Sequence, residues 1–178
     1  MAIVLLIEAD DIRKFRNVAS GVNEEKEIHS FILEAQELDI KPVLGNALYT
    51  NLLSNRTSTI YKALLDGGEY TYEAKVYSFM GLKTVIAYFT HSRYILNRNV
   101  QDTPFGAMVK GENEYGKATA DKEIQRISIQ SANSGQSFLD DVMVFLERNK
   151  TTYPLYESGD CSETNERPKR GFKFNKVG

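Results

Sequence analysis

The chain has 178 residues, of which 42% are hydrophobic, and this length predicts one domain with an extension rather than two domains. Its 22 basic and 24 acidic residues give a net charge of -2, without the basic excess of proteins that bind nucleic-acid phosphates. The single cysteine, Cys161, excludes an intramolecular disulfide, and with only two histidines beside it a Cys/His zinc site is not expected.

The first residues, 2–7, are apolar and β-prone, and they predict a short strand. The run is too short to span a membrane and lacks the basic flank of a signal peptide. We therefore expect a soluble protein that is made in a cytoplasm and has no membrane partner. Asp10 is the expected N-cap of a short helix near residues 11–18.

Residues 24–39 predict an amphipathic helix, because an acidic first turn is followed by apolar side chains at helical spacing. The Lys-Pro dipeptide at 41–42 is expected to break this helix. The predicted apolar stripe consists of Ile28, Phe31, Ile32, Ala35 and Leu38.

Two short helices and a hairpin are predicted next. The helices cover residues 47–53 and 60–65, and the Asp-Gly-Gly at 66–68 ends the second one. Residues 69–72 and 76–79 then alternate and are rich in β-prone side chains, which predicts a small antiparallel hairpin. Its turn contains neither Gly nor Asn.

Residues 81–97 predict the most hydrophobic helix, which is apolar nearly all round and must be buried on both sides. It is either the central helix of the domain or a helix whose second face is covered by another subunit. Arg93 falls on its apolar stripe and must find a carboxylate or carbonyl partner. His91 is expected to be a hydrogen-bonded interface residue and not a general base, since no Ser or Cys nucleophile is placed to use it.

A long polar loop is predicted over residues 98–118, and one long helix over residues 121–149. Small residues (Ser131, Ser134 and Gly135) lie on the packing face of this helix and permit another backbone to approach closely. The alternative is a break at Gly135.

The composition becomes polar after Tyr156, and we divide the chain into a helical core, 1–156, and a C-terminal extension, 157–178. The extension ends in the alternating segment 172–177, which is typical of an arm that docks elsewhere. Its basic residues suggest a second hypothesis, a small nucleic-acid-binding or regulatory protein that acts through this tail. They are Arg167, Lys169, Arg170, Lys173 and Lys176.

No catalytic, cofactor-binding or metal-binding residue is predicted, and we do not expect an enzyme. Residues 111–117 have the spacing of a phosphate-binding loop, but Ala118 replaces the Ser or Thr that would bind magnesium, so a nucleotide-binding enzyme is a third and weaker hypothesis. Helix capping and a solvated helix face explain the carboxylate pairs at 10–11 and 140–141. Cys161 is expected to be a spectator thiol.

Five sequence segments, taken in order along the chain, are ELDIKPVLGNALYTNLL, LLDGGEYTYEAKVYSFMGLKTVIAYFTHSRYI, TPFGAMVK, YPLY and GFKFN. Together they resemble head–tail connector (adaptor) proteins of tailed bacteriophages, most closely those of Bacteroides-type and crAss-like phages. The resemblance covers about residues 10–177. One departure lies in the hairpin turn, where similar proteins have a glycine and this chain has Glu73-Ala74.

The resemblance implies a structural virion protein of the portal vertex, made in the host bacterial cytoplasm. It implies a homo-oligomeric ring, generally dodecameric, that joins the portal protein to the next tail or ring protein and extends the DNA channel. Genomic DNA would pass through without sequence-specific binding, which the slightly negative net charge suits.

The expected fold is mainly α, a bundle of about four to six helices with a small β-hairpin, a long loop and an extended C-terminal arm. We expect the loop and the arm to lock the ring to its partners, with the arm strand adding to a partner's sheet edge. The candidate partner-binding residues are Thr103, Pro104, Phe105, Lys169, Arg170, Phe172 and Phe174.

Overall fold

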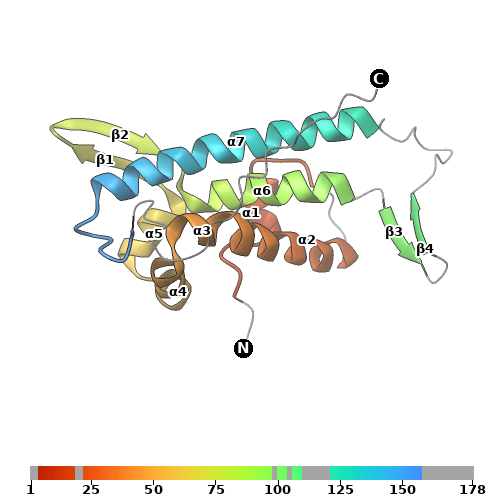
Figure 1. Ribbon diagram of the computed structural model, residues 1–178, viewed down its shortest axis with the longest axis horizontal. Coiled ribbons are helices and arrows are strands. Elements are labelled where there is room, and N and C mark those ends of the chain that lie inside the picture. Colours follow the sequence, from red (N-terminus) through yellow and green to blue (C-terminus); the bar gives the residue numbers. More distant parts are fainter. Residues whose placement is uncertain (1–3, 19–21, 98–99, 104–105, 110–120, 158–178) are drawn as a thin grey trace, which may run out of the picture.

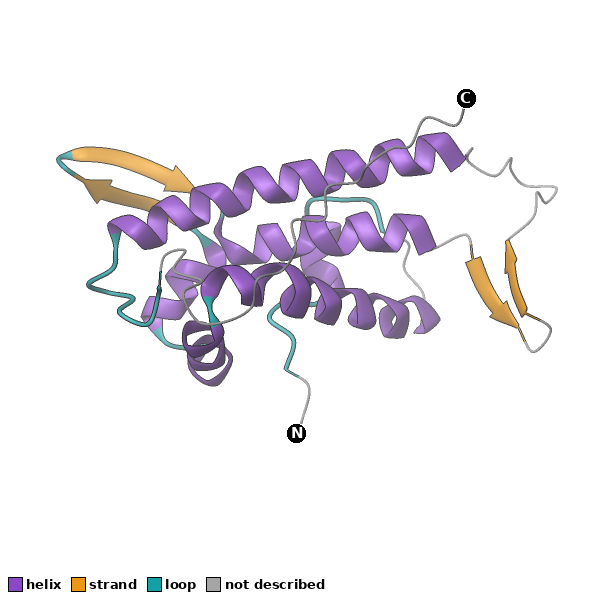
Figure 2. Cartoon of the chain, viewed as in Figure 1, coloured by secondary structure: helices purple, strands orange, loops and turns teal. Residues whose placement is uncertain are grey.

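Helix α6 (Gly81–Asn97) lies at the centre of the fold, with α2 (Val22–Ala35) on one side and α7 (Asp121–Arg148) on the other (Figure 1). The molecule is mainly helical and carries two-stranded antiparallel hairpins (Figure 2), which confirms the predicted fold class. The computed structural model describes residues 4–18, 22–97, 100–103, 106–109 and 121–157.

The second face of α6 is covered by α7 of the same chain, so of the two predicted alternatives the central helix is the correct one. The long helix α7 runs without a break at Gly135. A Cβ atom added at Gly135 would stand 3.2 Å from the ring of Phe89 on α6, so the small residue permits the close approach that the sequence predicts. Hydroxyl groups also join the helices, because Ser92 and Ser128 lie 3.0 Å apart between their Oγ atoms.

Helix α2 does not end at residue 41 but continues through the π-helical segment η1 (Gln36–Ile40) into α3 (Lys41–Leu44). The predicted break is therefore wrong. Pro42 occupies the first turn of α3, where a missing N–H is tolerated. The helical path stops at Gly45, whose φ of 76° leaves the helical region.

The π-helical turn explains a second error, which concerns Leu38. A π turn holds an extra residue and so rotates the following side chains away from the α-helical stripe. Leu38, predicted on the buried stripe, is 61% exposed, whereas Gln36 and Ile40 are fully buried. The half-buried Arg93 finds the predicted carboxylate in this segment, since its Nη1 and Nη2 lie 2.6 and 3.0 Å from the two carboxylate oxygens of Asp39.

The N-terminal segment forms no strand over residues 4–7, contrary to prediction. Its backbone is bound by the side chain of Gln36: the N–H of Leu6 donates to Oε1 (2.7 Å), and Nε2 donates to the carbonyl of Val4 (3.2 Å). Helix α1 (Ala9–Arg13) follows, and its N-cap is Glu8 and not Asp10.

The two short helices are confirmed as α4 (Asn46–Asn55) and α5 (Thr59–Asp66). The hydroxyl of Ser58 caps α5 by accepting from the N–H of Tyr61, and Gly67 ends the helix at a φ of 76°. In this region, as in the rest of the described chain, no helix is both long and apolar enough to cross a membrane.

The predicted hairpin is confirmed as β1 (Gly68–Tyr72) and β2 (Lys75–Phe79). Its turn residues, Glu73 and Ala74, have φ angles of 47° and 60°. This two-residue turn therefore takes the left-handed backbone that usually requires Gly or Asn.

A second hairpin, β3 (Val100–Thr103) and β4 (Gly106–Val109), stands where the sequence predicts an uninterrupted loop. That prediction is wrong for these eight residues, and the rest of the 98–118 segment lies outside the described residues. The buried core draws side chains from Leu6 to Tyr156. Residues 158–178 also lie outside the described part, so the arm and its strand stay predictions.

Candidate assembly surfaces

The β1–β2 hairpin projects beyond the helices at one end of the molecule (Figure 1). Its register pairs Tyr70 with Tyr77 and Gly68 with Phe79, and directly paired residues of an antiparallel ladder lie on the same face. Rings from this face contact Phe145 of α7: Phe79 stacks on it at 4.1 Å between centroids, and Tyr70 meets it edge-on at 5.0 Å. The base of the hairpin is thus part of the core.

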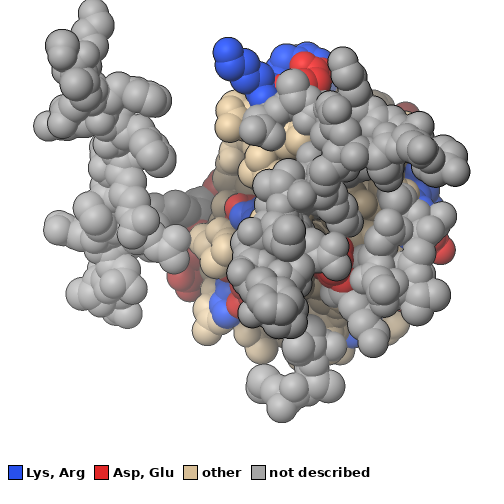
Figure 3. All heavy atoms as spheres, turned by 90° about the vertical axis from the view of Figure 1, so that its right-hand side faces the viewer, with Lys and Arg blue, Asp and Glu red and all other residues tan. Residues whose placement is uncertain are grey.

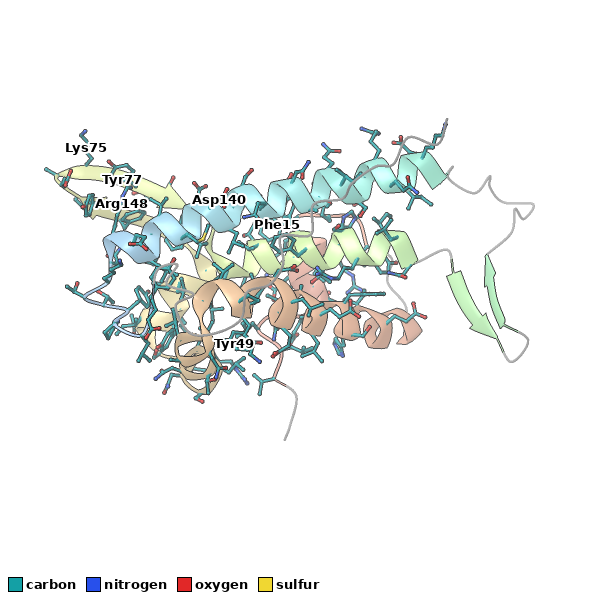
Figure 4. The ribbon with its side chains drawn as sticks, in the orientation of Figure 1. Phe15, Tyr49, Lys75, Tyr77, Asp140 and Arg148 are labelled. Atoms are coloured by element: carbon teal, nitrogen blue, oxygen red, sulfur yellow. The ribbon has the colours of Figure 1, made fainter. Side chains whose placement is uncertain are left out.

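Arg148, at the C-terminal end of α7, holds the outer half of the same face (Figure 4). Its guanidinium lies 4.0 Å from the ring centroid of Tyr77 and 5.1 Å from that of Tyr72, distances at which cation–π attraction operates. Its Nη1 also donates to the hydroxyl of Tyr70 at 2.9 Å. The pKa of Arg148 lies above its usual value. Burial lowers this pKa, but the hydrogen bond to Tyr70 and the nearby tyrosines raise it more, so the guanidinium stays charged.

The opposite face of the hairpin points to solvent. Glu69, Thr71, Val76 and Ser78 are all exposed, and Val76 is 67% exposed. In a two-stranded sheet each strand also has one outer edge whose backbone groups lack a strand partner. The hairpin therefore presents an apolar side chain and open edges on an element that the tyrosines and Arg148 hold in place.

Replacing Arg148 with Ala is expected to loosen the hairpin, because an isolated two-stranded ribbon is marginal in water. We expect the free energy of unfolding to fall through lost cation–π contact and packing. Amide hydrogen exchange should speed up in β1 and β2 more than in α6.

Arg148→Lys is the matched variant, since it keeps the charge but loses the planar stack. We expect it to lie nearer to Arg148→Ala than to the wild type in hairpin exchange. Equal protection in Arg148→Lys and wild type would show that charge alone, and not stacking, holds the hairpin.

The candidate partner-binding residues lie mostly outside the described chain. Thr103 ends β3 and pairs with Gly106 of β4, so it stands beside the turn of the second hairpin. Pro104 and Phe105 follow it, outside the described residues. The same holds for the arm residues Lys169, Arg170, Phe172 and Phe174.

His91 is hydrogen-bonded as predicted, but within the chain and not at a subunit interface. Its Nδ1 lies 2.8 Å from the Oγ of Ser131 on α7. A serine is therefore placed beside this histidine, contrary to expectation. Ser131 is 0% exposed and His91 is 4% exposed, so a substrate has no path to the pair, whose visible role is to join α6 to α7.

The predicted carboxylate pairs have structural partners. Asp10 lies 2.6 Å from Nη1 of Arg13, and Asp11 lies 2.7 Å from Nζ of Lys14. Asp11 also completes the capping box of α1. Asp140 accepts a hydrogen bond from Gln136 at 2.8 Å. Cys161 and the glycine-flanked segment at 111–118 lie outside the described residues.

A further polar cluster ties η1 to α4. Tyr49 donates to a carboxylate oxygen of Glu37 at 2.9 Å, and Lys41 donates to the other at 2.7 Å. The hydrogen bond from Lys41 lowers the pKa of Glu37, and burial raises the pKa of Tyr49 to about 12. Both groups therefore stay in the protonation states that this structural network needs.

A pocket of about 310 Å³ lies between the N-terminal segment and α1 on one side and the α4–α5 connection, α5 and the start of α6 on the other. Its charged lining is balanced, with three cationic and three acidic side chains, and Lys83 pairs with Asp66 at 2.6 Å. Within the described ranges no group of His, Cys, Asp and Glu is placed to hold a metal ion.

Comparison with known proteins gives one family. The model of DUF6712, a family of unknown function, matches residues 40–166. The chain belongs to this family. The DUF6712 match covers the β1–β2 hairpin, α6, α7 and Arg148, and it begins after α1 and α2. No curated protein and no solved structure matches the chain.

Sequence reasoning missed Arg148, the residue that fixes the hairpin. A signal was present, because Tyr70, Tyr72 and Tyr77 fall on one face of the predicted hairpin and Arg148 lies one helical turn after Phe145 on the packing stripe. What the sequence does not contain is the crossing of hairpin and helix, which brings together residues 78 positions apart.

Proposed function

We propose that this protein is a structural component of a tailed-phage virion, a ring-forming connector that joins the portal to the tail and extends the DNA channel. The assignment to a phage rests on the resemblance of five sequence segments of this chain to head–tail connector proteins. The observation that carries the assembly role is the projecting hairpin, whose outward face is exposed and whose inward face is fixed by Arg148 and Phe145.

The charge distribution supports passage of DNA without binding. Figure 3 shows the end of the molecule opposite the β1–β2 hairpin, and acidic and basic residues are mixed among the described side chains visible there. With a net charge of -2, the chain provides no single-sign basic field that would retain phosphates.

In the proposed ring, the β1–β2 hairpin contacts the neighbouring subunit through Val76 and an open strand edge. The residues at and after Thr103, and the arm residues Phe172 and Phe174, bind the portal or the next ring. Helix α6 takes no part in these contacts, because α7 of the same chain covers its second face.

Val76→Glu tests the ring contact, since it places a charge on the exposed hairpin face without touching the core. We expect this variant to fold like the wild type but to form no ring with the portal protein of the same phage, as measured by light scattering. Ile60→Glu is the matched control, because Ile60 is also an exposed hydrophobic residue (47%) but lies on α5. Normal ring mass in Val76→Glu would remove the hairpin from the interface.

Deleting residues 158–178 tests the arm. Among the described residues the buried core reaches Tyr156 without help from this segment, so we expect a folded protein that no longer binds portal. Unchanged portal binding would contradict this role. A salt-dependent shift of DNA by the full chain, lost on the same deletion, would instead favour the nucleic-acid-binding hypothesis.

A further inference from the structure

The outward face of α7 carries a regular row of exposed residues. At about 100° per residue, six of them fall within about 40° of the line that points away from the core. Ser131 and Val142, on the opposite side of the helix, are fully buried. We call the exposed row the outer stripe: Arg126, Ile129, Asn133, Ser137, Asp140 and Val144.

The middle of the outer stripe is uncharged and hollowed. Residues 127–139 contain no charged side chain, although 26% of the whole chain is charged. A hollow of about 440 Å³ lies along this part of the helix, bordered by Arg126, Ile129, Asn133 and Ser137 among others. Ile129 is 61% exposed beside it. A centre without charged residues, bounded by charged ends, matches the depletion of charge at the core of protein interfaces.

The charges at the two ends of the outer stripe are complementary to each other. Arg126 and Asp140 each lie seven residues from Asn133, or about 10.5 Å along the helix axis. If a second copy of α7 crosses antiparallel at Asn133, Arg126 of each copy meets Asp140 of the other. In the same register Ile129 of each copy meets the small Ser137 beside the hollow.

We propose that two copies of this chain associate through their outer stripes, antiparallel and related by a two-fold axis at Asn133. A second copy is the occupant because the pattern is complementary to itself under that operation, which a two-fold interface requires. Arg126 now pairs with Glu123, but that ion pair is exposed and so contributes little. Glu123 and Asp141, about 80° from the centre of the stripe, lie at the rim of the contact.

This contact goes beyond the proposed ring and does not depend on it. Neighbours in a ring are related by a cyclic operation and bring different surfaces together, whereas the outer stripe meets itself. The dimer is a property of the free chain, so it is tested without portal.

Cysteine cross-linking in a Cys161→Ser background tests the register. Asn133→Cys places the two thiols at the two-fold axis, and we expect a disulfide-linked dimer after mild oxidation. Gln130→Cys is the control, because its copies are separated by six residues, about 9 Å along the axis, beyond the reach of a disulfide. Cross-linking at both positions would indicate a parallel contact, and none at position 133 would indicate no contact; either result overturns the proposal.

Charge reversal tests the ends of the stripe. Either single variant, Arg126→Asp or Asp140→Arg, places two like charges side by side at both ends of the dimer contact. We expect each variant to weaken dimerisation at least about tenfold, as measured by sedimentation equilibrium. The double variant Arg126→Asp/Asp140→Arg should restore it, and Lys62→Glu, on α5, should not change it. A monomeric wild type, or a double variant as weak as the single ones, would overturn the proposal.

Discussion

Gly81→Ala is expected to remove a large part of the free energy of unfolding, about 4 kcal/mol or more. Gly81 begins α6 with a φ of 74°, where the chain leaves the β1–β2 hairpin. A Cβ atom there would stand 2.3 Å from the backbone N of Gly67 and 2.5 Å from the carbonyl O of Leu65. Backbone atoms at these distances cannot give way without separating α5 from α6.

Gly45→Ala is the control for this effect. Gly45 has nearly the same φ, 76°, but an added Cβ would meet nothing within 4 Å. Only the backbone is then strained, because a φ of 76° with a ψ of 157° is a conformation nearly restricted to glycine, and we expect a loss of about 1–3 kcal/mol. Urea denaturation followed by circular dichroism measures both variants. Equal losses would show that the backbone angle, and not the contact of Gly81 with Gly67, requires glycine.

Gln36→Met is the second substitution with a large expected effect. Methionine fills a similar volume but leaves the N–H of Leu6 and the carbonyl of Val4 without their side-chain partner. Since Gln36 is fully buried, we expect a loss of about 2–3 kcal/mol. Amide exchange at Leu6 should also become fast, because the N-terminal segment would detach from η1.

Gln125→Met provides the control, because Gln125 is exposed on α7 and the same change there should alter stability by less than about 0.5 kcal/mol. Slow exchange at Leu6 in Gln36→Met would contradict the role given to the glutamine. A loss confined to global stability, without faster exchange in residues 4–7, would do so as well.

The elements of this protein differ in how well their own sequence predicts them. Helices α6 and α7 were predicted nearly to the residue, because their apolar side chains recur over many turns and local periodicity outweighs single polar residues. The β1–β2 hairpin was predicted from alternation although its turn lacks glycine. In each case the signal lies within the segment itself.

The errors have two causes, a partner that lies far away in the sequence and a local π-helical turn. Residues 4–7 are β-prone, but a side chain some 30 positions later supplies their hydrogen bonds, so no strand forms. A Lys-Pro dipeptide usually stops a helix. Here η1 ends at Ile40 and α3 begins at Lys41, so Pro42 lies in the first turn of α3, where its missing N–H is tolerated. The exposure of Leu38 follows from the same π turn.

The sequence by itself determined a helical protein with one helix that must be covered on both faces and a small hairpin, because hydrophobic period and turn residues act over short distances. Only the tertiary structure decided that α7 of the same chain is the second cover, that Arg148 fixes the hairpin, and that the outer stripe of α7 stays exposed. These features depend on which faces meet when segments up to 93 residues apart pack together, and the local sequence pattern does not determine that choice.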